Sequence, residues 1–229
     1  MSKRIVKKTK IKLLNLLLVL LIFVGLFFGV EELIKVPTKN LLIKGTTYLN
    51  DDYLLNFGGL KDYPEFILFP ERKVEKEIKK SNYINNCNIK KKWGFLLEIN
   101  VDENKPLFYD LSKEKYVLSN KEEVPLDDIS KQFRVPRLMN YVPDKKYNKF
   151  IKEMSNVQID VLSEIGDIEY QPNDYDKDRF LLYMDDGNMV YLTLTKFKMI
   201  NQYNKVLSQL EGHKGILYLD SGNHFQIKE

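Results

Sequence analysis

The chain has 229 residues, with 36 Lys plus Arg, 32 Asp plus Glu and a formal net charge of +4. Six of the cations lie in the first twelve residues, which contain no acidic residue, so the rest of the chain carries 30 basic and 32 acidic residues. This distribution argues against a nucleic-acid-binding protein, which spreads Lys and Arg along the surface that follows the phosphates. Because aromatic residues make up 12% and only 11 Gly and 8 Pro occur, a disordered or collagen-like chain is excluded.

An apolar segment at residues 13–30 follows this basic tail directly. Fifteen of its eighteen residues are Leu, Ile, Val or Phe, and none is charged. A helix rises about 1.5 Å per residue, so the segment would be roughly 27 Å long, close to the hydrocarbon thickness of a bilayer. We predict a transmembrane helix at 13–30 behind a cytoplasmic tail at 1–12, whose topogenic cations are Lys3, Arg4, Lys7, Lys8, Lys10 and Lys12.

Two other interpretations of the apolar segment exist. A cleaved signal peptide also starts with basic residues, but its apolar region has about 7–15 residues and ends at a small-residue cleavage site, which does not precede Glu31. A buried core helix is disfavoured by the cationic flank on one side only. An uncleaved anchor fits better, and the acidic Glu31 and Glu32 after it place the N-terminus in the cytoplasm and the following domains outside.

The first part of the external chain, residues 36–107, is predicted to fold in the order strand, helix, helix, strand, strand. Residues 40–44 are an apolar strand that ends at Gly45, and Asn50 or Asp51 is positioned to cap a short helix that stops at Gly58. A second helix is expected from Pro70, with strands at 87–92 and 95–102 around Trp93 and Gly94. The lone Cys87 permits no intramolecular disulfide and is interpreted as a buried small hydrophobic residue.

The second part, residues 108–229, is predicted to contain a largely antiparallel sheet with a few helices. Residues 185–188 (Asp-Asp-Gly-Asn) give a hairpin signal between strands at 180–184 and 189–194. Thr195 is expected to cap a helix that Gly212 ends. Further elements are a helix at 145–154 and strands at 116–118, 165–170, 215–220 and 225–227.

The order of these elements resembles the FtsQ/DivIB family of bacterial cell-division proteins. In that family a POTRA domain and a β domain follow one membrane helix, and the POTRA domain begins with a strand that ends in a Gly-containing turn. The stretch from Leu97 to Pro106 is similar to the apolar strand and Glu-Arg-x-Pro-like motif that close it, although Asn104 stands where the family usually has Arg. The motif positions retained here are Gly45, Glu103 and Pro106.

This resemblance implies a scaffold of the cell-division machinery without a cofactor or enzymatic activity. It implies binding of FtsL-like and DivIC/FtsB-like single-pass subunits, an indirect link to the septal wall synthase, and a place in the cell membrane at the division septum. A sheet edge can accept a partner segment as one more strand. The C-terminal stretch is the expected edge, with the partner-binding residues Leu217, Leu219, Asp220, Ser221, Gly222, Phe225 and Ile227.

The runner-up function is a membrane-anchored cell-envelope hydrolase or another wall-binding protein. The sequence contains no nucleophile elbow, P-loop or dinucleotide-binding motif, which lowers the expectation of an enzyme. Neighbouring acidic pairs at 51–52 and 127–128 are candidates for an acid and a base, but such pairs more often form caps and turns. A POTRA-type transport component would require repeated POTRA modules or a barrel, for which the sequence gives no sign.

Two groups of residues were considered as metal ligands. The sequence Asp174-x-Asp-x-Asp178 begins like an EF-hand loop, but Arg179 and Asp185 occupy the positions of the loop's Gly and Glu. His213 and His224 have no Cys or further His at ligand spacing and are interpreted as exposed turn residues. The sequence therefore predicts no metal site.

Overall fold

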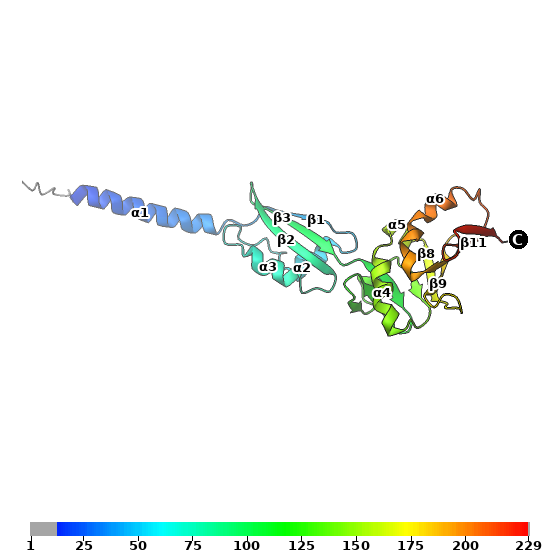
Figure 1. Cartoon of the computed structure of the whole chain (residues 1–229). Coiled ribbons are helices and arrows are strands. Elements are labelled where there is room, and N and C mark those ends of the chain that lie inside the picture. Colours follow the sequence, from blue (N-terminus) through cyan, green and yellow to red (C-terminus); the bar gives the residue numbers. More distant parts are fainter. Residues whose placement is uncertain (1–12, 229) are drawn as a thin grey trace, which may run out of the picture.

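The computed structural model describes residues 13–228, which fold as a long helix followed by two α+β units in a row (Figure 1). The first unit contains a three-stranded sheet and the second a nine-stranded sheet. The C-terminus and the strand next to it lie at the end of the molecule opposite the helix (Figure 1). The predicted α+β class with an N-terminal apolar helix is confirmed.

Helix α1 spans Leu13–Ile34 and stands clear of both units. Its stretch Asn15–Ile34 has a mean hydropathy of 2.5 with none of it buried, and it is long and apolar enough to cross a membrane. The helix ends four residues beyond the predicted 13–30, because Glu31 lies one turn before Lys35 and pairs with it at 3.0 Å. The six topogenic cations at positions 3–12 lie outside the described residues.

The sheet of the first unit has the strand order β1-β3-β2. Strand β1 (Asn40–Lys44) runs parallel to β3 (Leu96–Glu103), and β2 (Ile84–Lys92) runs antiparallel to it, so β3 is central and the other two are edges. In β3 the alternate side chains at 97, 99 and 101 are buried, as the alternating pattern predicts. Strand β2 starts three residues earlier than predicted, because a bulge between Ile84 and Asn86 lets the two asparagines continue the strand.

Two short helices cover one face of this sheet. Helix α2 (Asp51–Phe57) is capped by Asn50, whose side chain accepts a hydrogen bond from the backbone N–H of Tyr53 at 2.8 Å. Helix α3 (Glu71–Ile78) follows Pro70 and buries Ile78. The predicted Asn50 cap is confirmed, whereas Pro70, expected in the first turn of the second helix, lies just before it. The buried Leu54 and Ile78 join the apolar side of β3 in one core.

The second unit is built on nine strands in the order β12-β11-β10-β9-β8-β7-β4-β5-β6. Neighbouring strands are antiparallel except for β11 with β10, β8 with β7, and β7 with β4, which are parallel. The bounds are β4 Pro106–Asp110, β5 Lys115–Leu118, β6 Glu123–Val124, β7 Arg137–Leu138, β8 Ile165–Tyr170, β9 Arg179–Met184, β10 Met189–Thr193, β11 Gly215–Tyr218 and β12 His224–Ile227.

The main core of the second unit lies between this sheet and its helices. Helix α4 (Asp144–Ser155), helix α5 (Ile159–Leu162), the 3₁₀-helix η2 (Leu194–Gln202) and helix α6 (Tyr203–Leu207) supply the covering side, while η1 (Ser130–Gln132) lies in the loop after β6. Three fully buried rings meet at its centre: Phe150 stacks on Phe180 at 4.8 Å, and Phe197 stands edge-on to both.

Several elements differ from the sequence prediction. The helix expected from Thr195 is a 3₁₀-helix up to Gln202, because its apolar residues Leu194, Phe197 and Ile200 are spaced by three and eclipse on one side. Strands β4 and β6 and helix α5 were not predicted. Each is too short to show a periodic pattern, and β4 is buried on both faces.

The two units share an aromatic contact where they meet. Phe133 of the second unit packs edge-on against Tyr48 and Tyr83 of the first, at centroid distances of 5.8 and 6.0 Å. The Tyr83 hydroxyl donates a hydrogen bond to Asp127 at 2.7 Å. This contact continues the core of the first unit into the second through Leu118, so the described chain is a continuous rod from α1 to β12.

Candidate partner-binding edge

Strand β12 is the last strand of the nine-stranded sheet. It pairs antiparallel with β11 in the register Gly215–Ile227 to Tyr218–His224, and its other side faces solvent. The N–H of Lys228 donates to the carbonyl of Lys214 at 2.9 Å, which makes these two residues a hydrogen-bonded pair. Because such pairs alternate along an antiparallel ladder, the N–H and C=O groups of Phe225 and Ile227 point away from the sheet. These groups form an open edge.

The side chains of β12 alternate between its two faces. Phe225 packs against the main core, and Ile227 on the same face is 55% exposed. A hollow of about 130 Å³ adjoins these two side chains, with Leu210 and His213 on its other side. An incoming strand would therefore find an apolar side chain and a shallow hollow beside the unpaired backbone groups.

On the opposite face of β12, three aromatic rings stack across neighbouring strands. His224 lies parallel to Tyr218 at 4.7 Å, and Tyr218 stacks on Tyr191 of β10 at 5.4 Å. The guanidinium of Arg179 lies 3.5 Å from the centroid of the Tyr191 ring. His224, interpreted from the sequence as an exposed turn residue, is instead the first residue of the edge strand. This row was missed because it joins four strands that only the register brings together.

The close approach of β12 to β11 depends on a glycine. A Cβ atom on Gly215 would lie 2.0 Å from the carbonyl oxygen of Gln226, so no other residue fits without moving β12. The Gly215 N–H donates to the side-chain oxygen of Asn188 in the β9–β10 turn at 2.9 Å. The start of β11 is thus held by the close approach of β12 on one side and by the hydrogen bond to Asn188 on the other.

The turn that holds Gly215 is organised around Asp186. This carboxylate accepts hydrogen bonds from the backbone of Asn188 at 2.9 Å and from the Tyr203 hydroxyl at 2.8 Å, and Lys214 lies 3.7 Å away. Burial raises the pKa of Asp186, but the hydrogen bonds and Lys214 outweigh burial and hold the pKa below its ordinary value. The anionic form therefore stabilises the turn.

The structure divides the seven predicted partner-binding residues into three groups. Leu217 and Leu219 are 4% and 6% exposed and belong to the main core, since β11 is paired on both sides. The expectation that the edge includes β11 is wrong: of these two strands only β12, with Phe225 and Ile227, ends the sheet, whose other end strand is β6. Asp220, Ser221 and Gly222 follow β11 in the turn that leads to β12.

The Asp220 carboxylate already binds another side chain of the protein. It accepts a hydrogen bond from the Arg179 side chain at 2.7 Å, and both side chains are largely buried. Lys196 donates to the backbone carbonyl of Asp220 at 3.1 Å. Asp220 therefore anchors the β11–β12 turn to β9 and η2, whereas Gly222, with φ of +86°, supplies the left-handed conformation of that turn.

Comparison with known proteins bears on the first unit directly. Residues 36–104 match the family model described as the POTRA domain, FtsQ-type. This range begins just after α1 and ends just after β3, so it contains the whole three-stranded sheet and its two helices. The chain contains an FtsQ-type POTRA domain.

The similarity to cell-division proteins extends beyond the POTRA domain. The cell division protein DivIB of Listeria monocytogenes is 27% identical over 98% of this chain and 85% of its own length. DivIB of Bacillus subtilis is 27% identical over 71% of this chain, and DivIB of Pediococcus pentosaceus is 24% identical over 96%. The matches cover 63% and 62% of those two relatives, so the chain spans less than two thirds of their length. The chain is thus similar to DivIB proteins over most of its length, and this similarity supports a role in cell division.

A solved structure also matches part of the chain. The major extracytoplasmic domain of DivIB from Geobacillus stearothermophilus aligns with 48% of this chain and 96% of its own, at 20% identity and a TM-score of 0.38. The relatives are named for cell division and not for a reaction. In the part of the chain from residue 13 to residue 228, no group of three or more His, Cys, Asp and Glu side chains is arranged to hold a metal ion.

The three motif positions expected from the sequence, Gly45, Glu103 and Pro106, have structural roles. Glu103 accepts hydrogen bonds from three successive backbone N–H groups at residues 47–49, at 2.8–2.9 Å, and so ties the loop after β1 to the end of β3. Gly45 has φ of +88°, and a Cβ there would lie 2.1 Å from the Val101 carbonyl oxygen. Pro106 opens β4 and leads into the second unit.

Asn104, which stands at the expected Arg position of the motif, is buried. Its side-chain amide donates to the carbonyl of Asn82 at 2.7 Å, and its backbone N–H donates to the carbonyl of Tyr83 at 2.8 Å. Asn104 therefore forms local hydrogen bonds at the junction of the two units.

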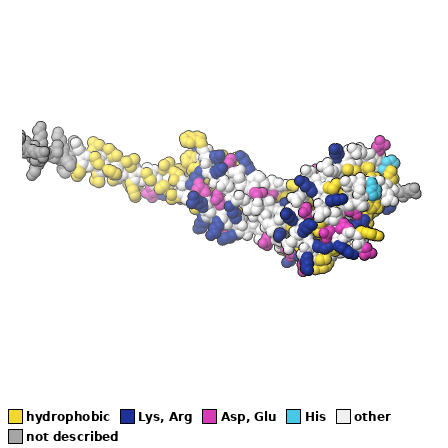
Figure 2. Space-filling view, viewed as in Figure 1, with side chains coloured by type: hydrophobic (Ala, Val, Ile, Leu, Met, Phe, Trp, Pro, Cys, Tyr) yellow, Lys and Arg dark blue, Asp and Glu magenta, His cyan; other side chains and the backbone are white. Residues whose placement is uncertain are grey.

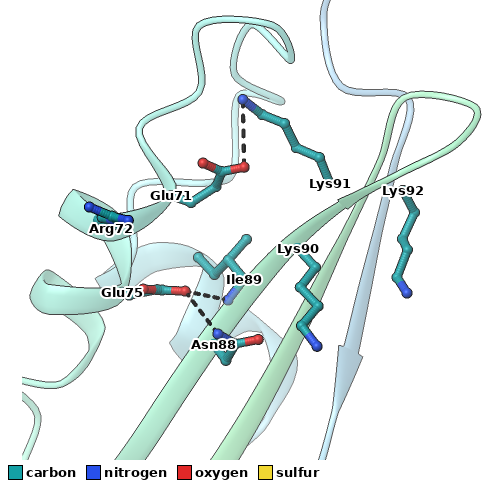
Figure 3. A pocket seen from close by; sticks show the side chains of 8 residues that line it. All are labelled: Glu71, Arg72, Glu75, Asn88, Ile89, Lys90, Lys91 and Lys92. Atoms are coloured by element: carbon teal, nitrogen blue, oxygen red, sulfur yellow. Dashed lines mark hydrogen bonds and ion pairs between the residues drawn. The ribbon is translucent and has the colours of Figure 1, made fainter.

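The outer edge of β2 in the POTRA domain is covered, in contrast to β12. The N–H of Ile89 points out of the sheet and donates to the Glu75 carboxylate of α3 at 2.7 Å (Figure 3). The outward N–H of Cys87 is bonded to the Asn86 side chain at 2.9 Å. Lys91 of β2 pairs with Glu71 of α3 at 3.6 Å, which holds the helix along the strand (Figure 3). Side chains thus occupy two of the outward N–H groups, those of Cys87 and Ile89, that a partner strand would need.

Strand β1 is the remaining edge of the POTRA sheet. The N–H of Lys39 donates to Phe95 of the β2–β3 loop, so alternation directs the N–H of Leu42 outward. Leu42 is 40% exposed, which makes β1 the internal control for any experiment on β12.

Proposed function

We propose that the chain is a single-pass, non-enzymatic scaffold of the cell-division machinery. It holds FtsL-like and DivIC/FtsB-like membrane subunits through the outer edge of β12 and, through them, helps regulate septal peptidoglycan synthesis. Helix α1 anchors the chain in the cell membrane with the two α+β units outside, and the protein acts at the division septum. Its mechanism is assembly without turnover.

The observation that carries this proposal is the open edge of β12. The outward backbone groups of Phe225 and Ile227 are polar groups without a ladder partner, and an extended segment that pairs with them gains main-chain hydrogen bonds. The half-exposed Ile227 and the hollow beside it add apolar contact that discriminates among segments. A partner held in this way needs no net charge on the chain, which fits the balance of 30 basic and 32 acidic residues beyond position 12.

The shape of the molecule supports the same role. The edge lies at the end of the rod farthest from α1, so a partner that is itself anchored in the membrane would meet it with the part of its chain that rises well above the bilayer (Figure 1). The shared core around Phe133 joins the two units that lie between the anchor and the edge.

Membrane co-purification followed by mass spectrometry tests the proposal. The full chain is expected to recover two small single-pass membrane proteins with extended extracytoplasmic segments. Ile227→Asp places a charge in the apolar contact of the edge and should remove them, whereas Leu42→Asp, at a similarly exposed position on β1, should not. Equal recovery with both variants would contradict the assignment to β12.

Localisation is the second test. A fluorescent fusion of the full chain is expected to concentrate at the division site and to remain there through constriction. An even distribution around the membrane throughout the cell cycle, together with failure to recover any single-pass partner, would overturn the division role itself.

A further inference from the structure

Aromatic and aliphatic side chains gather at the end of the POTRA domain that adjoins α1. We call this group the proximal tip; it consists of Phe66, Ile67, Leu68, Trp93 and Phe95. Trp93 is 100% exposed and Leu68 is 61% exposed. A hollow of about 540 Å³ lies between the two loops that carry them. Figure 2 shows hydrophobic side chains along α1 and a further group of them on the adjoining end of the POTRA domain.

Backbone hydrogen bonds tie both loops of the proximal tip to the first residues after α1. The N–H of Phe66 donates to Val36 at 3.0 Å, and the N–H of Lys39 donates to Phe95 at 2.9 Å. Since α1 ends at Ile34, these attachment points lie two and five residues beyond it. An extended chain spans at most about 3.6 Å per residue, so the tip is held within roughly 20 Å of the end of the helix.

Lysines surround the apolar side chains of the tip. The Lys39 ammonium lies 5.2 Å from the centroid of the Phe95 ring, and the Lys91 ammonium lies 5.8 Å from that of Phe66. Lys39 and Lys92 are exposed, and Lys92 lies 3.8 Å from Glu98. The acidic residues at the end of α1, at positions 31 and 32, are both within ion-pair distance of Lys35.

We propose that the proximal tip docks on the anionic phospholipid surface of the outer leaflet, as a second membrane contact beside α1. Indole and phenyl rings favour the headgroup region, and lysines next to them attract lipid phosphates. The fully exposed Trp93 and the largely exposed Leu68 would gain nothing from facing water, whereas the short connection to α1 brings them to the bilayer. Docking fixes the tilt of the rod relative to the membrane and hence the height of β12 above it. This inference rests on the part of the proposed function in which α1 spans the membrane.

The fluorescence of Trp93 tests the inference, because it is the single tryptophan of the chain. The full chain is reconstituted in vesicles of phosphatidylglycerol with phosphatidylcholine, some carrying brominated acyl chains. In these vesicles Trp93 is expected to emit at a shorter wavelength than in detergent micelles. Brominated lipid should quench its fluorescence, and the vesicle should shield it from quenching by acrylamide. Full acrylamide quenching without any effect of brominated lipid would overturn the proposal.

A matched control places the tryptophan in the second unit instead of the POTRA domain. Tyr175 is also 100% exposed, but it lies in the β8–β9 loop of the second unit. The double variant Trp93→Phe/Tyr175→Trp should show an unshifted emission, full acrylamide quenching and no quenching by brominated lipid. The same shielding at both positions would mean adsorption of the whole protein and would contradict a specific tip.

Charge reversal separates an anionic surface from a purely apolar contact. Lys39→Glu with Lys92→Glu should expose Trp93 to acrylamide at least several-fold more in phosphatidylglycerol vesicles, and wild-type protein in phosphatidylcholine alone should resemble this variant. Equal shielding in all three samples would overturn the anionic preference. Flotation of the same vesicles checks the anchor: protein that floats with a solvent-exposed Trp93 contradicts only the tip, whereas protein that does not float contradicts the membrane anchor as well.

Discussion

Strands β2 and β12 both end a sheet, yet only one of them is left open. Along β2, the Glu75 carboxylate of α3 and the Asn86 side chain accept from outward N–H groups, so the POTRA sheet covers this edge with its own side chains. Along β12, the equivalent groups of Phe225 and Ile227 have no strand or helix beside them. An exposed edge is a liability for aggregation, and proteins normally protect it. This difference is the basis of our proposal that a partner strand covers β12.

Removing β12 from the sheet should have the largest effect on partner binding. In Gly215→Val the new side chain meets the Gln226 carbonyl and the Phe225 ring and displaces β12. Several main-chain hydrogen bonds of about 1 kcal/mol each are lost, so affinity should fall by roughly a hundredfold or more. Quantitative co-purification with purified partner measures this loss, and circular dichroism checks folding. A folded variant with unchanged affinity would contradict the role of β12.

Deleting one outward donor should have a smaller effect. Ile227→Pro removes an N–H that faces away from β11 and leaves the β11–β12 ladder intact, since proline is tolerated at such edge positions. We expect partner affinity to fall roughly fivefold to tenfold. Leu42→Pro makes the same change on β1 and should leave affinity unaltered; a loss of affinity in this variant instead would assign the binding edge to β1.

Uncovering β2 should change stability and leave partner binding unaltered. Glu75→Ala removes the acceptor of the Ile89 N–H, and the free energy of unfolding should drop by about 1–3 kcal/mol. Glu75→Gln retains an acceptor oxygen and should lose less. Urea unfolding of both variants measures the difference in the free energy of unfolding. Partner affinity is measured for the same variants at the same protein concentration. Loss of affinity in Glu75→Ala would show that β2 also takes part in partner binding.

The smallest expected effect is the pH dependence of the turn that holds β11. Because the pKa of Asp186 is lowered in the folded protein, its stabilisation is present above the unfolded-state pKa of about 3.9 and is lost as pH falls through the folded value. Asp186→Asn should therefore destabilise by about 1 kcal/mol at neutral pH, and this difference should shrink as the pH is lowered below about 3.9. Chemical unfolding over a series of pH values tests it; a pH-independent difference would assign the effect to packing.

The sequence predicted the parts of this comparison that depend on local patterns. The apolar run of α1, the alternation in β3, the Asn50 cap and the turn at Gly187 each follow from neighbouring residues, and the structure confirms them. The resemblance to the FtsQ/DivIB family supplied the order of the units. It also placed the expected partner-binding segment in the C-terminal stretch, which contains the edge strand β12.

What the sequence did not predict depends on pairing between distant strands. Leu217 was assigned to the edge because β11 and β12 are both short and apolar, and only the parallel pairing of β11 with β10 shows that β11 is internal. The protection of Ile89 by Glu75 joins a helix to a strand 14 residues away and leaves no mark in either segment. The two-residue strands β6 and β7 are likewise defined by their neighbours alone.

Residue-resolved hydrogen–deuterium exchange of the full chain, with and without its co-purified membrane partners, tests the central claim most directly. If the partner adds as a strand to β12, exchange at the amides of Phe225 and Ile227 slows strongly on binding, while exchange at Ile89, already bonded to Glu75, does not change. Rapid exchange at Phe225 and Ile227 in a fully formed complex would contradict the account.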